Sequence, residues 1–251
     1  MKLTIHKRMI KEIPVLEVVP ENKSSAPLPL IIFYHGWQNT KELSLTQARR
    51  LAANNFRVII PDAMFHGKRN QWDRSSIPSL TFWTTIAYNL LEFSIILDYA
   101  HKKNWILDHR IGVSGYSMGG ITTSALLTSH PEISAAASIM GTSQPWAYFN
   151  LMKSRIKDTN YLLPDELTLI LQWVKDVDLG RHPEKIDGRP FLLWHGTLDD
   201  RIPYTLTKKF YDNIKEQSYA ERTIFLTGKE EGHLVTTELM DTITDFFTAN
   251  L

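Results

Sequence analysis

Short apolar runs alternate along the chain with longer segments whose apolar residues repeat at helical spacing. The short runs have the pattern of strands buried on both faces, and they are residues 30–34, 56–60, 110–114, 135–140, 191–194 and 223–226. The longer segments are residues 42–54, 82–103, 120–127 and 234–248, which we expect to be helices. This alternation predicts an α/β fold whose mostly parallel sheet is covered by helices on both faces.

Two regions depart from this alternation. Residues 3–9 and 13–19 alternate polar and apolar positions around Lys11 and Glu12, which predicts an antiparallel hairpin at the N-terminal edge of the sheet. Residues 144–182 are too long for a simple connection and rich in large apolar side chains, with Leu167, Ile170, Leu171 and Val174 on one helical face. We interpret them as a small helical lid inserted into a single domain of residues 1–251; helices packed on the sheet are the alternative.

Composition narrows the class of protein. A formal net charge of +1 gives no electrostatic reason to expect a nucleic acid or an acidic membrane as partner. The absence of cysteine excludes disulfides, thiolate metal sites and a cysteine nucleophile, and it fits a reducing compartment. Charges throughout residues 1–20 argue against a signal peptide, and no apolar run approaches the ~20 residues of a membrane span. We therefore expect a cytoplasmic protein with no membrane span.

Residues 115–119 read Gly-Tyr-Ser-Met-Gly and lie between a predicted strand and a predicted helix. Small neighbours allow a tight strand-to-helix turn that lifts the hydroxyl of Ser117 above the sheet, beside the positive end of the helix. In this context we predict that Ser117 is a nucleophile. The pattern alone is weak, and a glycine-serine turn without chemistry is the alternative.

A serine nucleophile needs an imidazole to take its proton and a carboxylate to orient that imidazole. Among the histidines after the turn, His182 belongs to the 144–182 segment and His195 lies at the end of a strand, before any acid. His233 lies in a polar, glycine-bearing loop that could reach over the sheet, so we predict that it is the base. For the acid we choose Asp199, although spacing separates it poorly from its neighbour Asp200.

The negative oxygen that develops in the reaction needs preorganised donors, and backbone N–H groups are the usual ones. The N–H groups of Met118, at the helix start, and of Trp37, after the first buried strand, are our candidates. Gly36 would let the backbone approach the substrate. The further candidates for lining the substrate pocket are Tyr116, Trp146 and Phe149.

Residues 61–69 carry a second set of polar side chains, Asp62, His66 and Arg69. They could bind a metal or a substrate, but a catalytic zinc site needs three protein ligands, and one His-Asp pair is too few. We favour a hydrogen-bonded loop that supports the wall next to the oxyanion donors, and we expect no metal.

Taken together, the motifs HGW, PDAMFHGKR, GYSMGG, HGTLDDRIP and GHLV resemble the α/β-hydrolase superfamily over nearly the whole chain. They look most like small bacterial serine esterases related to dienelactone hydrolases and to the catalytic domain of prolyl oligopeptidases. The resemblance implies an α/β-hydrolase fold, an acid at Asp199, a carboxylic ester as substrate and no cofactor. Dienelactone hydrolases use cysteine where this chain has Ser117, and oligopeptidases carry a propeller domain that this sequence lacks.

These observations predict a serine esterase acting on small-molecule esters, with short acyl chains favoured by the aromatic residues of the 144–182 segment. A peptidase or amidase and an acyltransferase with the same three residues are the alternatives within enzymes. A hydrolase-like fold kept only for binding would not require Ser117, Asp199 and His233 together. The sequence leaves a homodimer open, because an exposed apolar patch can be a lid, a substrate entrance or a dimer face.

Overall fold

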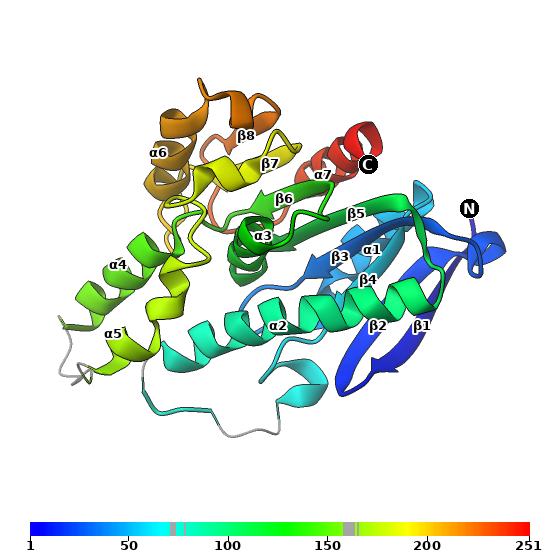
Figure 1. Ribbon diagram of the computed structural model, residues 1–251, viewed down its shortest axis with the longest axis horizontal. Coiled ribbons are helices and arrows are strands. Elements are labelled where there is room, and N and C mark those ends of the chain that lie inside the picture. The colour runs from blue at the N-terminus through cyan, green and yellow to red at the C-terminus, as the bar shows by residue number, and fades with distance from the viewer. Residues whose placement is uncertain (71–73, 78, 158–163, 165) are drawn as a thin grey trace.

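The computed structural model describes residues 1–70, 74–77, 79–157, 164 and 166–251, and it contains one eight-stranded sheet (Figure 1). The strands lie in the order β1-β2-β4-β3-β5-β6-β7-β8. Their bounds are β1 (Leu3–Ile10), β2 (Ile13–Pro20), β3 (Leu28–Tyr34), β4 (Arg57–Pro61), β5 (Ile106–Tyr116), β6 (Ala135–Ile139), β7 (Phe191–Gly196) and β8 (Thr223–Gly228).

The N-terminal strands form the predicted antiparallel edge hairpin. Strand β1 pairs with β2 from Leu3 opposite Pro20 to Ile10 opposite Ile13, and β2 pairs antiparallel with β4 on its other side. Every later pair, from β4–β3 to β7–β8, is parallel. The prediction of a mostly parallel sheet with an antiparallel edge is therefore confirmed.

Helices cover both faces of the sheet, as the sequence predicts. The hydrophobic core forms two clusters, one on each face of the sheet. The helices of the first face are α2 (Leu80–Lys102), α3 (Met118–Ser129) and α6 (Tyr204–Ile214), and those of the other face are α1 (Leu45–Ala53) and α7 (Thr237–Asn250). Helices α4 (Pro145–Lys157) and α5 (Glu166–Ile170) lie together beyond the end of α2 (Figure 1). Part of the predicted lid, residues 158–163 and 165, lies outside the described residues.

Two elements differ from the sequence interpretation. Helix α6 was not predicted; its buried side chains are Thr207, Phe210 and Ile214, of which only two are apolar. The predicted helical face of the 144–182 segment is also wrong at one position. The chain changes from α-helix to 3-10 helix after Ile170, so Ile170 is exposed while Leu171 and Val174 are buried.

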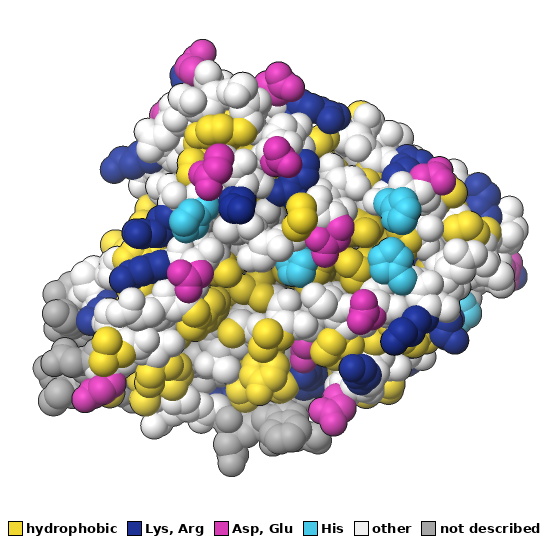
Figure 2. Space-filling view, in the orientation of Figure 1, with side chains coloured by type: hydrophobic (Ala, Val, Ile, Leu, Met, Phe, Trp, Pro, Cys, Tyr) yellow, Lys and Arg dark blue, Asp and Glu magenta, His cyan; other side chains and the backbone are white. Residues whose placement is uncertain are grey.

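Helix α2 is unusually long and apolar. Among the described residues it is the one helix whose length and mean hydropathy of 1.3 match a membrane span, and half of that window is buried within the protein. Trp83, Phe93 and Ile96 are fully buried, so much of this hydrophobicity fills the core. Apolar side chains also reach the surface over this helix, among interspersed charges of both signs (Figure 2), and Leu91 is the most exposed of them.

Candidate active site

Ser117 occupies a strained turn between β5 and α3. Its φ of 57° and ψ of −114° lie outside the regions that a residue with a side chain normally adopts. The turn is held from both sides, because the Ser117 N–H donates to the Ile139 carbonyl at 2.9 Å and the Ser117 carbonyl accepts from the Ile121 N–H at 3.0 Å. Backbone strain of this kind persists only where surrounding contacts enforce it, and it is found mainly at functional sites.

The glycines around the turn are required by close backbone packing. A Cβ on Gly119 would lie 2.2 Å from the Tyr34 carbonyl oxygen, and one on Gly115 would lie 2.6 Å from the same atom. A Cβ on Gly120 would lie 2.8 Å from the Ile139 carbonyl oxygen on the other side. Helix α3 therefore sits directly on β3 and β6, and only glycine fits at these positions.

Asp199 and His233, far apart in sequence, are hydrogen-bonded to each other. His233 Nδ1 lies 2.7 Å from Asp199 Oδ2, and the other carboxylate oxygen accepts the backbone N–H groups of Arg201 and Ile202 at 2.9 Å each. The Asp199 side chain is fully buried, whereas Asp200 is exposed. Of the two adjacent acids, Asp199 is the one that can orient an imidazole.

The electrostatic surroundings keep Asp199 ionised. Burial alone would raise the pKa of this carboxyl, but hydrogen bonds from His195, His233 and the Ile202 N–H outweigh it and hold the pKa well below its usual range. A carboxylate that stays charged can stabilise a positive charge on the His233 imidazole.

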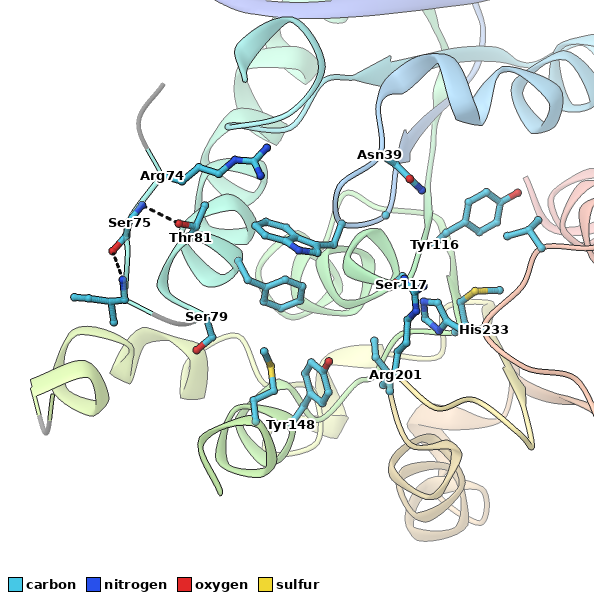
Figure 3. A pocket seen from close by; sticks show the side chains of 18 of the residues that line it. Asn39, Arg74, Ser75, Ser79, Thr81, Tyr116, Ser117, Tyr148, Arg201 and His233 are labelled. Carbon is cyan, nitrogen blue, oxygen red and sulfur yellow. Dashed lines mark hydrogen bonds between the residues drawn. The ribbon is translucent and has the colours of Figure 1, made fainter. Parts of the chain in front are cut away.

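Ser117 and His233 line the same cavity, which has a volume of about 640 Å³. They lie next to each other at one end of it, and Arg201 is beside them (Figure 3). Within the described residues no hydrogen bond joins Ser117 to His233, and His233 is tied to Asp199 instead. Contacts between a nucleophile and its base often tighten only when substrate binds.

The loop after β3 approaches Ser117 from the side opposite His233 in Figure 3, and its conformation is tightly fixed. A Cβ on Gly36 would lie 3.6 Å from the Ser117 Cβ, so this backbone faces the turn. The Gly36 carbonyl lies 2.8 Å from His35 Nδ1 and accepts the Asn39 N–H at 3.2 Å. In a trans peptide the carbonyl and the following N–H point in opposite directions, so these bonds also fix the direction of the Trp37 N–H.

The hydrogen bond from His35 to the Gly36 carbonyl requires a proton on Nδ1 of the His35 ring. Burial lowers the pKa of His35 to about 4, so the ring is neutral at neutral pH. Its Nε2 accepts the Ala63 N–H at 3.1 Å, which leaves the single ring proton on Nδ1, where it is donated to the Gly36 carbonyl. The second candidate donor, Met118, begins α3 directly after Ser117.

The Asp62 carboxylate is occupied by hydrogen bonds and an ion pair with neighbouring residues. Its carboxylate pairs with Lys41 Nζ and accepts the backbone N–H groups of Lys41 at 3.1 Å and Lys68 at 3.0 Å. Arg69 forms two hydrogen bonds with the Glu92 carboxylate at 2.7 and 2.8 Å, and its guanidinium also donates to the Asp62 carbonyl. Among the described residues, no three His, Asp or Glu side chains gather where they could hold a metal ion.

His66 connects this loop to the candidate oxyanion donor. Its Nε2 accepts the Gln38 N–H at 3.0 Å, and its Nδ1 lies 2.8 Å from the Met64 carbonyl. The His66 ring also packs against Trp37, with 4.8 Å between ring centroids. The polar side chains of residues 61–69 thus hold the segment that follows Gly36.

The far end of the cavity is formed by residues that the sequence analysis did not select. They come from the segment after β4, from the first turn of α2 and from α4: Arg74, Ser75, Ser79, Thr81 and Tyr148 are labelled in Figure 3, and Met152 lies one turn after Tyr148 on α4. Of our pocket candidates, Gly36 and Tyr116 line the cavity.

Trp146 and Phe149 require a correction, because they lie outside the lining of this cavity. Helix α4 turns Tyr148 and Met152 toward the cavity. Phe149 is instead fully buried against Trp83, and Trp146 packs under Lys175. The abundance of large apolar residues identified the segment but could not tell which face of its helix meets the cavity.

Comparisons with known proteins agree with this architecture. The prolyl oligopeptidase family matches residues 89–251, and the dienelactone hydrolase family matches residues 15–161. The chain is 33% identical to "Putative esterase YitV" of Bacillus subtilis, over 93% of both chains. It is 29% identical to "Esterase YjfP" of Escherichia coli, over 99% of this chain and 100% of that one.

The solved structure of TT1662 from Thermus thermophilus superimposes with a TM-score of 0.80 at 20% identity. That alignment covers 99% of this chain and 98% of TT1662. This likeness shows the fold, and the sequence matches show the family. The chain belongs to the α/β-hydrolase superfamily, in which it is a hydrolase related to bacterial esterases and matched by the prolyl oligopeptidase and dienelactone hydrolase families.

Proposed function

We propose that the protein is a serine carboxylesterase that uses Ser117, His233 and Asp199. The observation that carries the proposal is the meeting of three sequence-distant features: a strained serine turn, a buried Asp199–His233 hydrogen bond, and one cavity lined by both Ser117 and His233. A turn without chemistry would not need the strain, and a binding site would not need the buried acid.

In the proposed reaction, Ser117 Oγ attacks the ester carbonyl carbon while His233 Nε2 takes the hydroxyl proton. The backbone N–H groups of Met118 and Trp37 stabilise the negative oxygen. His233 then donates its proton to the leaving alcohol, and the acyl group remains on Ser117. Water repeats the sequence, with His233 as base, to release the acid and the free enzyme.

We propose small esters with short acyl chains as substrates. A cavity of about 640 Å³ is of the size that holds small ligands. Trp37 and Phe82 give it an apolar aromatic wall, while Arg74 and the hydroxyl groups of Ser75, Ser79 and Thr81 line its far end (Figure 3). A long alkyl chain would have to pass these polar groups, whereas a short one would contact only the aromatic side chains.

The test is hydrolysis of p-nitrophenyl acetate, butyrate and octanoate, beside the matched anilide p-nitroacetanilide. Ester hydrolysis by the wild type should fall by about 10⁴-fold or more in Ser117→Ala. Ser129→Ala is the matched control, because Ser129 is exposed at the other end of the same helix. Activity that survives in Ser117→Ala would overturn the assignment of the nucleophile.

The anilide distinguishes the second candidate, a peptidase or amidase. This candidate is favoured by the match of residues 89–251 to the prolyl oligopeptidase family. Faster cleavage of the anilide than of the acetate ester would replace the esterase proposal with this one. Formation of a new ester when an alcohol acceptor is added would instead indicate acyl transfer.

A further inference from the structure

A second histidine contacts the carboxylate that orients His233. His195, at the end of β7, is fully buried, and its Nε2 lies 3.1 Å from Asp199 Oδ2. This is the same oxygen that is 2.7 Å from His233 Nδ1. His195 is not among the residues that line the cavity, so it reaches the reaction only through Asp199.

The partners of His195 fix the position of one ring proton. Nε2 also lies 2.8 Å from the Ile202 carbonyl oxygen, and a carbonyl and an ionised carboxylate can only accept. Nε2 must therefore carry a proton. On the other side of the ring, Nδ1 lies 2.9 Å from Thr207 Oγ1, a hydroxyl that is itself 3.2 Å from the Gly141 carbonyl.

These contacts connect four parts of the fold around one carboxylate. His195 ends β7, Asp199 follows it in the loop, Thr207 lies on α6, and Gly141 follows β6. Each partner is buried, so the imidazole has little freedom to move. Asp199 Oδ2 is consequently held between two imidazoles, while Oδ1 is held by backbone N–H groups.

Resting on the proposed function, we propose that His195 is a positioning residue that holds the Asp199 carboxylate in the orientation from which it orients His233. The contact has a second consequence, because one oxygen divides its charge between two imidazoles. Removing the N–H of His195 would leave more of that charge to act on His233. The His233 imidazolium would then be more stable, and His233 would lose its proton at higher pH.

Other charged groups near this set have to be considered in a pH experiment. Tyr148 on α4 is close enough to Asp199 for the carboxylate to contribute to the raised pKa of its phenol, although burial is the larger cause. The further neighbours include Tyr204, whose ring is 6.1 Å from that of His195, Asp200 and Arg201 beside Asp199, and Glu230 and Glu231 on the His233 loop. All of them are unchanged in the variants below, so they cancel in the comparison with the wild type.

Three variants separate positioning from general support of the fold. His195→Leu removes the donor at similar size, and His195→Gln keeps an N–H donor near the position of Nε2. Thr207→Val leaves the imidazole and removes only the hydroxyl at Nδ1. His182→Leu is the matched control, because His182 is a partly exposed histidine outside the site. The measurements are kcat/KM for the acetate ester against pH and the titration of His233 by NMR.

In His195→Leu we expect kcat/KM to fall by about 10- to 100-fold, as for the loss of one hydrogen bond to a charged group. The acid limb of the pH profile and the NMR titration of His233 should both move to higher pH. His195→Gln should recover most of the rate and the wild-type titration. Thr207→Val should lower the rate by about threefold with a smaller shift in the same direction.

Unchanged titration of His233 in His195→Leu, whatever its rate, would overturn the proposal. If that variant does not fold, unchanged rate and titration in Thr207→Val would overturn it instead. The two readouts also separate this proposal from the proposed function. A wild type that hydrolyses no ester would refute the esterase, while the NMR titration would still test the contact between His195 and Asp199.

Discussion

The two ends of the cavity are built in different ways. At one end, Ser117 and His233 project from a backbone that is fixed by glycine packing, by buried carbonyls and by the Asp199 carboxylate. At the other end, Arg74 and Ser75 are exposed, and Met152 is half-buried on α4. The first end follows the carboxyl ends of parallel strands, and the second comes from segments outside the sheet.

This difference separates two tasks. Bond cleavage requires donors and acceptors held to a fraction of an ångström, which the sheet and its buried hydrogen bonds can provide. Choice among substrates depends on the size and polarity of side chains that can change without moving the sheet. Substitutions at the Ser117 end should therefore alter rate or stability strongly, and those at the far end should alter preference.

The largest effect is expected at Asp199. Asp199→Asn keeps the shape of the side chain but places an amide against His233, which favours the wrong ring tautomer. We expect kcat for the acetate ester to fall by about 10⁴-fold. Asp200→Asn is the matched control, since its side chain is exposed and adjacent in sequence, and it should change kcat less than about twofold. An equal fall in both variants would contradict the assignment.

The next effect concerns the packing under Ser117. Gly119→Ala would place a Cβ 2.2 Å from the Tyr34 carbonyl oxygen, so β3 and α3 would have to separate. We expect the free energy of unfolding in urea to fall by roughly 3 kcal/mol or more. Gly188→Ala has the same chemistry at a position with φ of 66° and free space around it, and should cost about 1 kcal/mol. Similar losses in both would refute the packing argument.

The third effect is a pH dependence of stability that originates at His35. Its pKa is about 4 in the folded protein and about 6.5 when unfolded. The unfolded chain therefore binds the proton first as pH falls, and the stabilisation present above about pH 6.5 is lost progressively toward pH 4. We expect this residue to account for roughly 3 kcal/mol of the loss.

His35→Gln should remove that part of the pH dependence, which is measured as the free energy of unfolding between pH 7 and 4. His182→Gln should retain it, because His182 is partly exposed. The folded His66 also has a lowered pKa, caused mainly by burial, and it contributes in the same direction in every variant. A slope that is identical in His35→Gln and the wild type would show that His35 is not neutral and buried in solution.

The sequence predicted the site residues that belong to local patterns, but not those that depend on how distant segments fold together. The local Gly-Tyr-Ser-Met-Gly pattern identifies Ser117 as a candidate, and the chain order of acid and base suggests Asp199 and His233. The contact of His195 with Asp199 has no such signal, because it depends on the path of the loop that returns over the end of β7. His195 was set aside as the base for its place on a strand, and that place is what brings it to the carboxylate.

The fold was predictable for a related reason, and its errors have physical causes. Continuous apolar runs and long apolar helical segments can be recognised from the sequence alone, whereas α6 is short and buries only three side chains, two of them apolar. Trp146 and Phe149 were expected in the cavity because of their size. Which face of α4 lines the cavity is decided by the packing of Trp83 against Phe149, from a helix more than sixty residues earlier.

The smallest effect is expected at the far end and tests the separation of tasks directly. Met152→Ala removes an unbranched side chain from the α4 wall of the cavity. The space gained should accept a longer acyl chain, so kcat/KM for the octanoate relative to the acetate ester should rise by up to about tenfold. Leu169→Ala, an exposed position on α5, should leave this ratio unchanged. Because Met152 takes no part in the hydrogen bonds that fix Ser117 and His233, kcat for the acetate should stay within about twofold of the wild type. A comparable fall in acetate turnover would mean that α4 supports the chemistry as well as the choice of substrate, and the two ends of the cavity would then have to be treated as one unit.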